Sequence, residues 1–354
     1  DLVCSPMALR QEAERATTEV SEVAPGILRL QLPIEMPGLG HVNCYALEDE
    51  RGVTVVDPGM PGPKSWKSLI DRFGRAGFAL RNVHTVVVTH SHVDHFGASG
   101  RLRVEAGADV VTADSFRTWW DPTDAGEQEL EVVDGEEDSP DRLPWDQPTP
   151  WGGPHPRPPL AVRARYKLMK PVMKKWFATP SPSTRLSDAQ VVSLGGREWV
   201  SVHTPGHTPD HLCLFDPAGG ILLSGDHVLP TITPHISGID GGPDPLSAFF
   251  ASLEKVAELK DVGLVLPAHG HPFTDLPGRA KDIRRHHEER LARLREAAAQ
   301  LGEASVEQLA QRLFRPRSWG SMAESETYAH LEHLRLAGEA DRRRDAGHLL
   351  YSLA

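Results

Sequence analysis

The sequence predicts an α/β protein, and two observations support that class. Short apolar runs alternate with amphipathic stretches and Gly/Pro turns from about residue 23 to 118. The same texture returns at residue 191 and continues to 271, after a long irregular segment. With 354 residues, of which 39% are hydrophobic, the chain can bury a substantial core, and its length is compatible with one large and one smaller domain.

Each regular element follows from its local pattern. In the first half we expect strands at Ile27–Leu32, Val42–Leu47, Val53–Asp57 and Val83–Thr89, with a helix near Lys64–Arg75. In the second half we expect strands at Val200–His203, Leu212–Phe215, Ile221–Leu223 and Leu264–Leu266, with a helix around Pro245–Leu259. Beyond residue 280 the chain is charged and helical, at Ile283–Leu301, Val306–Leu313 and Glu324–Ala337, and two short strands follow at Glu339–Arg343 and Leu349–Leu353. Three helices followed by two strands predict a winged-helix-like module.

These textures divide the chain into an N-terminal extension (1–22), a main α/β domain (23–280) and a helical winged-helix-like domain (281–354). Residues 119–183 interrupt the main domain as an insert that runs from acidic to Pro/Trp-rich to basic and apolar. A loop this long inside a compact domain is usually functional or disordered. The basic, apolar part, Arg163–Phe177, is either a cap that contacts an acyl chain and a phosphate, or a cap that packs on its own domain.

Composition excludes several classes. The formal net charge of −11 argues against general attraction to nucleic acid or anionic membranes, although a local basic site remains open. No apolar run is long enough for a membrane span, and the N-terminus lacks the pattern of a secretory signal, so we expect a cytoplasmic protein. Three scattered cysteines form neither a disulfide framework nor a metal knuckle.

The strongest chemical motif follows the strand at Val83–Thr89. It reads His90-Ser91-His92-Val93-Asp94-His95, so four potential ligands occupy six positions. In a tight loop after a strand, side chains at i and i+2 can point at one site while those at i+4 and i+5 point at a second site nearby. Imidazole and carboxylate suit zinc, and also iron or manganese. The motif therefore predicts a metal centre.

Three more single ligands follow predicted strands: His207 in Thr-Pro-Gly-His, Asp226 in Ser-Gly-Asp-His, and His269 in Pro-Ala-His-Gly. Together with the first motif they resemble the metallo-β-lactamase superfamily, in the HxHxDH branch that includes glyoxalase II, lactonases, thioesterases and ribonuclease Z. The resemblance covers roughly residues 23–275. It implies an αββα sandwich, and it implies that Asp57, at the end of an early strand, orients the metal loop.

By this resemblance His90, His92 and His207 bind one metal, Asp94, His95 and His269 bind a second, and Asp226 bridges them. The expected cofactors are two zinc ions, with iron or manganese as alternatives. The resemblance further implies that a metal-bridging hydroxide attacks the scissile carbonyl or phosphoryl group. In that scheme Asp94 and Asp226 are the catalytic residues, with Asp94 orienting the hydroxide and accepting its proton.

Other histidines are assigned by position. His211 and His227 lie near the ligands in sequence and are expected to support them, while His235 lies in the loop where relatives contact substrate, so it supports the metals or lines the substrate pocket. His286, His287, His330 and His333 lie on charged helices, where a solvated face is the ordinary explanation. These helices are also consistent with a homodimer. The list of expected supporting or substrate-contacting residues is thus Asp57, His211, His227 and His235.

Three functions remain open. The first is hydrolysis of a small-molecule thioester, such as an acyl-coenzyme A, or of a related ester or lactone, which fits the acidic chain and the large insert. The second is phosphodiester hydrolysis of RNA, because a hydrolase domain followed by a winged-helix-like module resembles the lactamase-beta-like branch. A positive groove leading to the metals would favour it. The third is a non-catalytic binding protein on a hydrolase scaffold.

Overall fold

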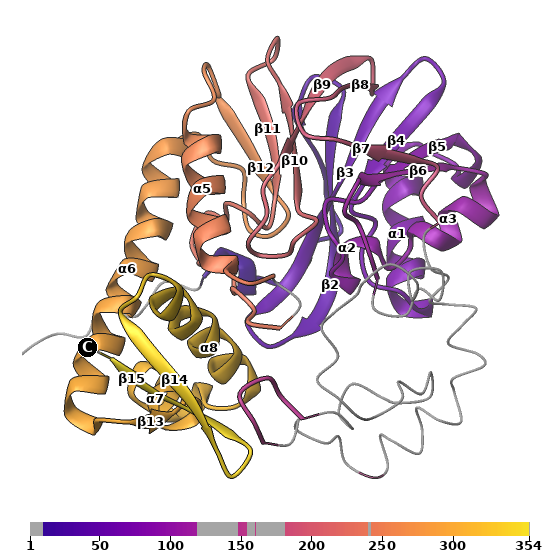
Figure 1. The fold of residues 1–354 in the computed structure, drawn as a ribbon. Coiled ribbons are helices and arrows are strands. Elements are labelled where there is room, and N and C mark those ends of the chain that lie inside the picture. Colours follow the sequence, from indigo (N-terminus) through magenta and orange to yellow (C-terminus); the bar gives the residue numbers. More distant parts are fainter. Residues whose placement is uncertain (1–9, 119–147, 154–159, 161–180, 240–241, 354) are drawn as a thin grey trace, which may run out of the picture.

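Two β-sheets pack face to face and carry helices on their outer faces in the computed structural model, which describes residues 10–118, 148–153, 160, 181–239 and 242–353 (Figure 1). The first sheet has seven strands in chain order: β1 (Val20–Ala24), β2 (Ile27–Met36), β3 (Leu39–Asp49), β4 (Gly52–Val56), β5 (Val83–Val87), β6 (Asp109–Ala113) and β7 (Thr184–Leu186). Strands β1 to β4 are antiparallel, and β4 to β7 are parallel. The parallel half receives α1 (Pro63–Ala76), α2 (Val93–Phe96) and α3 (Ser99–Ala106) as its connections.

The second sheet has five strands in the order β12 (Leu264–Pro267), β11 (Ile221–Gly225), β10 (Leu212–Asp216), β9 (Arg197–His203) and β8 (Val191–Leu194). All its pairs are antiparallel except β11 with β12, which are joined through α5 (Pro245–Ala257). A parallel pair requires a crossover, and a helix with an apolar face supplies it. Asp244 caps this helix by accepting from the backbone N–H of Ser247.

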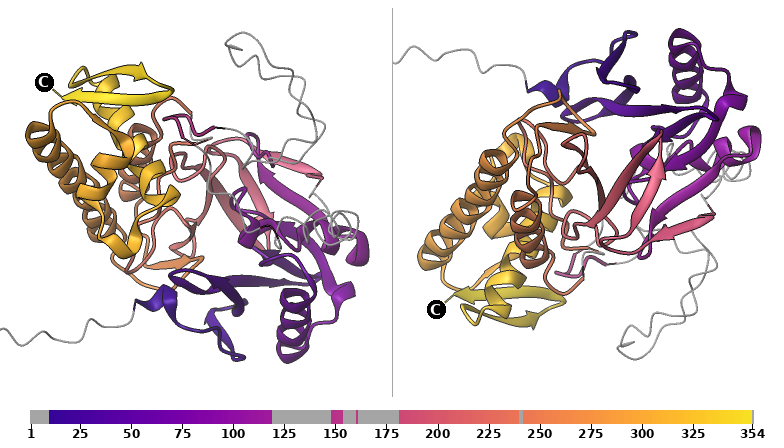
Figure 2. Two further views of the ribbon diagram at one scale, coloured as in Figure 1. Left: turned by 90° about the horizontal axis from the view of Figure 1, so that it is seen from below. Right: turned by 90° about the horizontal axis from the view of Figure 1, so that it is seen from above.

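Three apolar layers hold the sandwich together. The layer between the sheets includes Tyr45, Trp199 and Leu214, all nearly fully buried. Outside the seven-stranded sheet, Leu69 and Phe73 of α1 form a second layer. The third layer lies between the five-stranded sheet and the helices that follow it in the chain. These layers give the order helix, sheet, sheet, helix that the resemblance implies, and Figure 2 shows it from two further sides.

The C-terminal region continues the third layer. It contains α6 (Leu276–Leu301), α7 (Val306–Leu313), α8 (Ser321–Leu336) and a small sheet in the order β13 (Ala304–Ser305), β15 (His348–Leu353) and β14 (Ala340–Asp345). The sequence places the three helices and the last two strands correctly, although α6 begins seven residues before Ile283. The likeness to a winged-helix domain stays a prediction, as do the domain boundaries.

The histidines of the C-terminal helices and the basic insert were both given expectations from the sequence. His287 and His330 are fully buried, so the prediction that they occupy a solvated face is wrong for both, while His286 and His333 are partly exposed. The basic stretch Arg163–Phe177 lies outside the described residues, so nothing is said of its contacts. Among the helices that the structure describes, none has the length and apolar character to cross a membrane.

Candidate metal centre

The predicted ligands come from strand ends of both sheets. His90 and His92 lie in the loop after β5, and Asp94 and His95 lie on the short helix α2 that follows it. The remaining three follow β9, β11 and β12, at His207, Asp226 and His269. Because these strand ends meet at one edge of the sandwich, residues separated by up to 179 positions in sequence reach the same place. All seven predicted residues are brought together.

The seven side chains form two groups. His90, His92, His207 and Asp226 make up the first group, and Asp94, His95 and His269 make up the second, with the candidate ligand atoms of each group within 4.8 Å of one another. In the first group, Nδ1 of His92 lies 3.0 Å from Nε2 of His90 and 3.0 Å from Nε2 of His207. His92 is the most exposed of the seven. It therefore marks the side of the first group that faces solvent.

Asp226 lies between the two groups. Its Oδ2 is 3.6 Å from Nε2 of His207 in the first group and 3.6 Å from Nε2 of His95 in the second. Its Oδ1 is 3.3 Å from Nε2 of His269. The position suits a carboxylate that bridges two cations.

Four of the imidazoles are oriented through their second nitrogen. Nδ1 of His207 donates to the carbonyl of His235 at 2.7 Å, and Nδ1 of His269 donates to the carbonyl of His41 at 2.7 Å. Nδ1 of His90 lies 3.0 Å from the hydroxyl of Thr89. A ring that donates from Nδ1 keeps a lone pair on Nε2, and metal-binding histidines are usually fixed in this way. The hydrogen bonds thus direct Nε2 lone pairs toward the centre.

Asp57 fixes the fourth imidazole and the metal loop together. Its Oδ2 accepts from Nδ1 of His95 at 2.9 Å and from the hydroxyl of Thr89 at 2.8 Å, while Oδ1 accepts from the backbone N–H of Thr89 at 2.9 Å. Asp57 directly follows β4 in a left-handed conformation, with φ of +53°, which aspartate tolerates better than most residues. This turn aims the carboxylate back at the loop that carries His90 and His95.

Unpaired buried atoms show that these residues suit a bound cation. Among the described residues, Nε2 of His95, Nε2 of His269 and Oδ1 of Asp226 are buried and have no hydrogen-bond partner. Buried polar atoms nearly always have a hydrogen-bond partner, so three unpaired atoms in one place indicate a site for a cation. Imidazole and carboxylate donors fit zinc, iron or manganese.

The charges of the centre point the same way. Burial alone would raise the pKa of Asp226, but the facing His269 and His95 outweigh burial and hold the pKa well below its ordinary value. Burial opposes a charge on His95, yet Asp94 and Asp226 raise the pKa of this imidazole well above its ordinary value. The two carboxylates therefore create a site that attracts positive charge, which a metal ion can supply in place of protons.

His211 supports Asp226 and is not directed at the centre. Its Nδ1 contacts the hydroxyl of Thr204 at 2.7 Å, and its Nε2 accepts from the backbone N–H of Asp226 at 3.0 Å. Gly225 makes this approach possible, because a Cβ there would lie 2.6 Å from Nε2 of His211. Both ring nitrogens are therefore used in holding the bridging residue.

The other two assigned histidines contact helices outside the two ligand groups. His227 is buried, packs edge-on against Phe249 of α5, and burial lowers its pKa to about 3. His235 offers its backbone carbonyl to His207, while its Nδ1 lies 3.4 Å from a carboxylate oxygen of Glu326 on α8. Burial, and then the nearby His207, lower the pKa of His235 to about 3.

Sequence patterns missed several supporting groups. The ring of His41 accepts from the backbone N–H of Gly270, and Asn43 donates to the carbonyls of Pro267 and Gly270, so both brace the loop that carries His269.

A third group of possible ligands, His287, Glu326 and His330, lies between α6 and α8. Here Nδ1 of His287 lies 3.0 Å from Nε2 of His330, and Glu326 pairs with Arg290.

The comparison with known families agrees with this geometry. A family model described as the metallo-beta-lactamase superfamily matches residues 37–269, which is more than half of the chain. The chain belongs to the metallo-beta-lactamase superfamily. Because this superfamily comprises metal-dependent hydrolases, the chain is a metal-dependent hydrolase. Both the resemblance and the sandwich fold that it implies are confirmed.

Individual members of the metallo-beta-lactamase superfamily match to different extents. The lactamase-like protein nscB from Aspergillus fumigatus is 35% identical over 106 residues, which is 30% of each chain, so this match spans less than a third of that relative. The acyl-coenzyme A thioesterase MBLAC2 from Gallus gallus is 31% identical over 248 residues, covering 65% of this chain and 73% of the relative. The solved structure of a beta-lactamase domain protein from Burkholderia ambifaria matches with a TM-score of 0.72 and 27% identity over 96% of both chains.

Proposed function

We propose that this protein is a dinuclear metal-dependent thioesterase whose substrate is an acyl-coenzyme A or a chemically related ester or lactone. The observation that carries the proposal is the buried double cluster, in which Asp226 faces ligands of both groups. The similarity to an acyl-coenzyme A thioesterase over 65% of the chain supports the choice of a thioester.

Each group would hold one metal ion, for which we propose zinc, with iron or manganese as alternatives. His90, His92 and His207 would hold the first ion, Asp94, His95 and His269 the second, and Asp226 both. Two such ions would lower the pKa of a bound water molecule and would act as Lewis acids that polarise the acyl oxygen. The protein's own task is to hold seven donors in place, and the outer hydrogen bonds of Asp57 and of the backbone carbonyls do this.

Asp94 is proposed to move the proton. Its Oδ2 lies 3.5 Å from Nε2 of His95 and 3.6 Å from Nε2 of His269, so this oxygen belongs to the second group. Oδ1 is then the oxygen left to orient the attacking water and accept its proton. No Ser/His/Asp triad is required, because a metal-activated water would be the nucleophile and Asp94 would accept its proton.

The test combines metal analysis with a substrate panel. Purified protein is assayed for bound metal and for hydrolysis of acyl-coenzyme A, acyl-glutathione, a lactone, a phosphodiester and a short RNA. Two metals per chain with thioester turnover support the proposal. Two metals with RNA cleavage alone would replace it by the phosphodiesterase alternative, which uses the same metal chemistry. A chain with no metal and no turnover after reconstitution would overturn it.

Two further expectations go with this proposal and are tested separately. We propose that the protein acts in the cytoplasm on a small-molecule substrate and that its helical C-terminal region can support a homodimer. Fractionation of cells and light scattering of the purified chain check these two points.

A further inference from the structure

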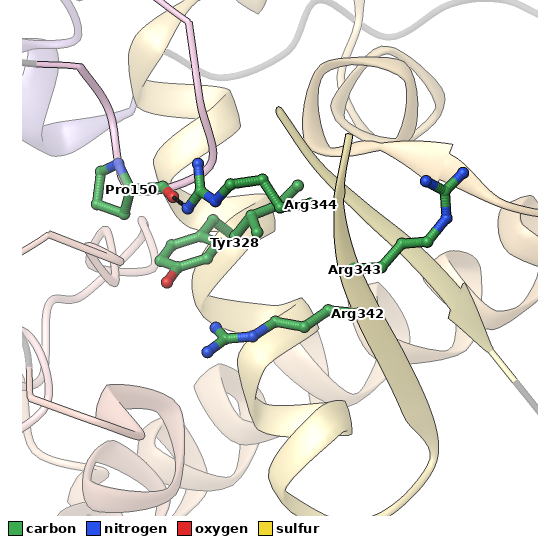
Figure 3. A pocket seen from close by; sticks show the side chains of 6 residues that line it. Pro150, Tyr328, Arg342, Arg343 and Arg344 are labelled. Atoms are coloured by element: carbon green, nitrogen blue, oxygen red, sulfur yellow. Dashed lines mark hydrogen bonds between the residues drawn. The ribbon is translucent and has the colours of Figure 1, made fainter. Parts of the chain in front are cut away.

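A cavity of about 360 Å³ lies beside the C-terminal sheet, and none of the predicted ligands lines it. It is lined by Pro150, Tyr328, Arg342, Arg343, Arg344 and Leu349. Its walls come from the segment 148–153, from α8 and from β14 and β15, so the main domain and the C-terminal region both contribute. Figure 3 shows this cavity from close by.

The arginines of β14 do not all face the cavity. Side chains alternate along a strand, and Figure 3 shows Arg342 and Arg344 on the side of Tyr328, with the guanidinium of Arg343 pointing to the opposite side. Arg343 is paired there with Glu303, at 2.7 Å from its Nε. Arg343 thus borders the cavity through its backbone, and its charge is neutralised elsewhere.

Positive charge is in excess on the Tyr328 side. Arg342 and Arg335 share one carboxylate, that of Glu332. Arg344 donates only to two backbone carbonyls, those of Gly347 at 2.7 Å and Pro150 at 3.2 Å, and among the described residues no carboxylate pairs with it. A guanidinium held by carbonyls keeps its full charge and has further N–H donors for an anion.

An aromatic wall completes the cavity. Tyr328 is half-buried, and its ring centroid lies 5.4 Å from that of Trp151. Trp151 in turn donates from Nε1 to Glu324 at 3.2 Å, which fixes the indole behind Tyr328. Aromatic rings next to arginines are the combination that proteins use to hold a nucleobase and its phosphates.

The cavity is close enough to the metal centre for one extended molecule to reach both. The carbonyl of His235 contacts His207, and Gly238 follows three residues later, so it lies within about 11 Å of His235 along the chain. Gly238 packs on the Tyr328 ring, since a Cβ there would lie 2.5 Å from Cδ1 of Tyr328. The loop that orients a predicted ligand therefore also touches the wall of the cavity.

We propose that this cavity binds the phosphorylated adenosine end of an acyl-coenzyme A, with Arg344 contacting phosphate and Tyr328 contacting the base. The proposal rests on the thioesterase function proposed above. A nucleotide held here leaves the long pantetheine arm to extend along the 235–238 loop and present the thioester to the metal centre. The excess charge, the aromatic wall and the short loop each match one part of such a substrate.

The test compares two thioesters that carry the same acyl group, one on coenzyme A and one on pantetheine, which lacks the nucleotide. Arg344→Gln is expected to raise KM for acyl-coenzyme A about tenfold and to leave kcat and the pantetheine thioester unchanged, because one charge-assisted contact contributes roughly that much. Arg344→Lys should restore part of the affinity. Arg343→Gln is the matched control, since it removes the same charge from the opposite face of the same strand.

The outcomes separate this proposal from the one it rests on. If Arg344→Gln hydrolyses acyl-coenzyme A with an unchanged KM, the proposed nucleotide site is wrong, while the proposed thioesterase function is supported. If neither thioester is cleaved, the thioesterase fails, and titration with adenosine 3′,5′-bisphosphate decides for the cavity. Binding to the parent protein that is lost in Arg344→Gln supports the site. No binding, or displacement by short RNA with equal affinity, overturns it.

Discussion

Replacement of Asp57 by asparagine probes how the metal loop is built. Asp57 accepts three hydrogen bonds, from the backbone N–H of Thr89, the hydroxyl of Thr89 and Nδ1 of His95. Asparagine has the same shape, but one of its two terminal atoms is a donor. If that donor takes the Oδ2 position, the His95 proton must move to Nε2, the atom that faces Asp94. If it takes the Oδ1 position, two buried N–H groups face each other at Thr89.

Both arrangements have a cost that can be worked from these contacts. Loss of the partner that orients a metal-binding histidine reduces metal affinity about 10–100-fold, or about 1.4–2.8 kcal/mol. A buried N–H without an acceptor costs about 1–3 kcal/mol of folding free energy. We therefore expect Asp57→Asn to bind its second metal at least about tenfold more weakly, to unfold more easily, or both.

The assay is competition for metal with a chelator of known affinity, together with urea unfolding of the metal-free protein. Asp49→Asn is the matched control, because Asp49 also accepts from a histidine, His84, and from backbone N–H groups, but lies outside the centre. Wild-type metal affinity and wild-type stability in Asp57→Asn would refute the orienting role of this carboxylate.

Four more predictions test the rest of the assignment. Asp226→Ala should reduce turnover more than about 100-fold, which is a larger effect than the loss of a residue that only orients a ligand. The far-ultraviolet circular dichroism spectrum should be unchanged. Metal removal should lower the melting temperature, since metal at 100 times its Kd stabilises the fold by about 2.7 kcal/mol per site. Burial holds the pKa of His287 and His330 well below 6.5 in the folded protein, so the free energy of unfolding should fall as pH drops below about 6.5. The fall should be up to about 1.4 kcal/mol per pH unit for each histidine. Urea unfolding at several pH values should show a less steep fall in His330→Gln. Glu326→Gln should weaken the contact of Glu326 with His235 and so loosen the loop after Asp226, giving a lower kcat with unchanged metal content.

The sequence was informative where the signal is local. Strand periodicity and the His90–His95 motif lie within short windows, so eight strands of the two sheets and a metal centre at this motif could be predicted from residue order. The strands β1, β6, β7 and β8 were not predicted, and the full grouping of the seven ligands came from the family resemblance. The supporting contacts could not be predicted from residue order. His269 is oriented by the backbone carbonyl of His41, which is 228 residues away, and a carbonyl acceptor leaves no trace in side-chain identity.

The buried histidines of the C-terminal helices did leave a signal. Ile283, His287 and Leu291 are spaced by four residues, so His287 lies on the apolar stripe of α6 and is buried with its neighbours. The charge of the surrounding residues favoured a solvated interpretation. In the structure, His287 is buried with the apolar stripe because His330 on α8 supplies the polar partner that a buried imidazole needs.

The loop after Asp226 ties both ends of the chain to the metal centre. Near the N-terminus, buried Glu12 accepts from the backbone N–H groups of Thr231 and Ile232, at 2.8 and 3.1 Å. Near the C-terminus, Glu326 faces His235 in the same loop, whose carbonyl orients His207. Since a carboxylate from each end holds the loop, both ends act on the position of a predicted ligand. The C-terminal region therefore contributes to the position of the predicted metal ligands.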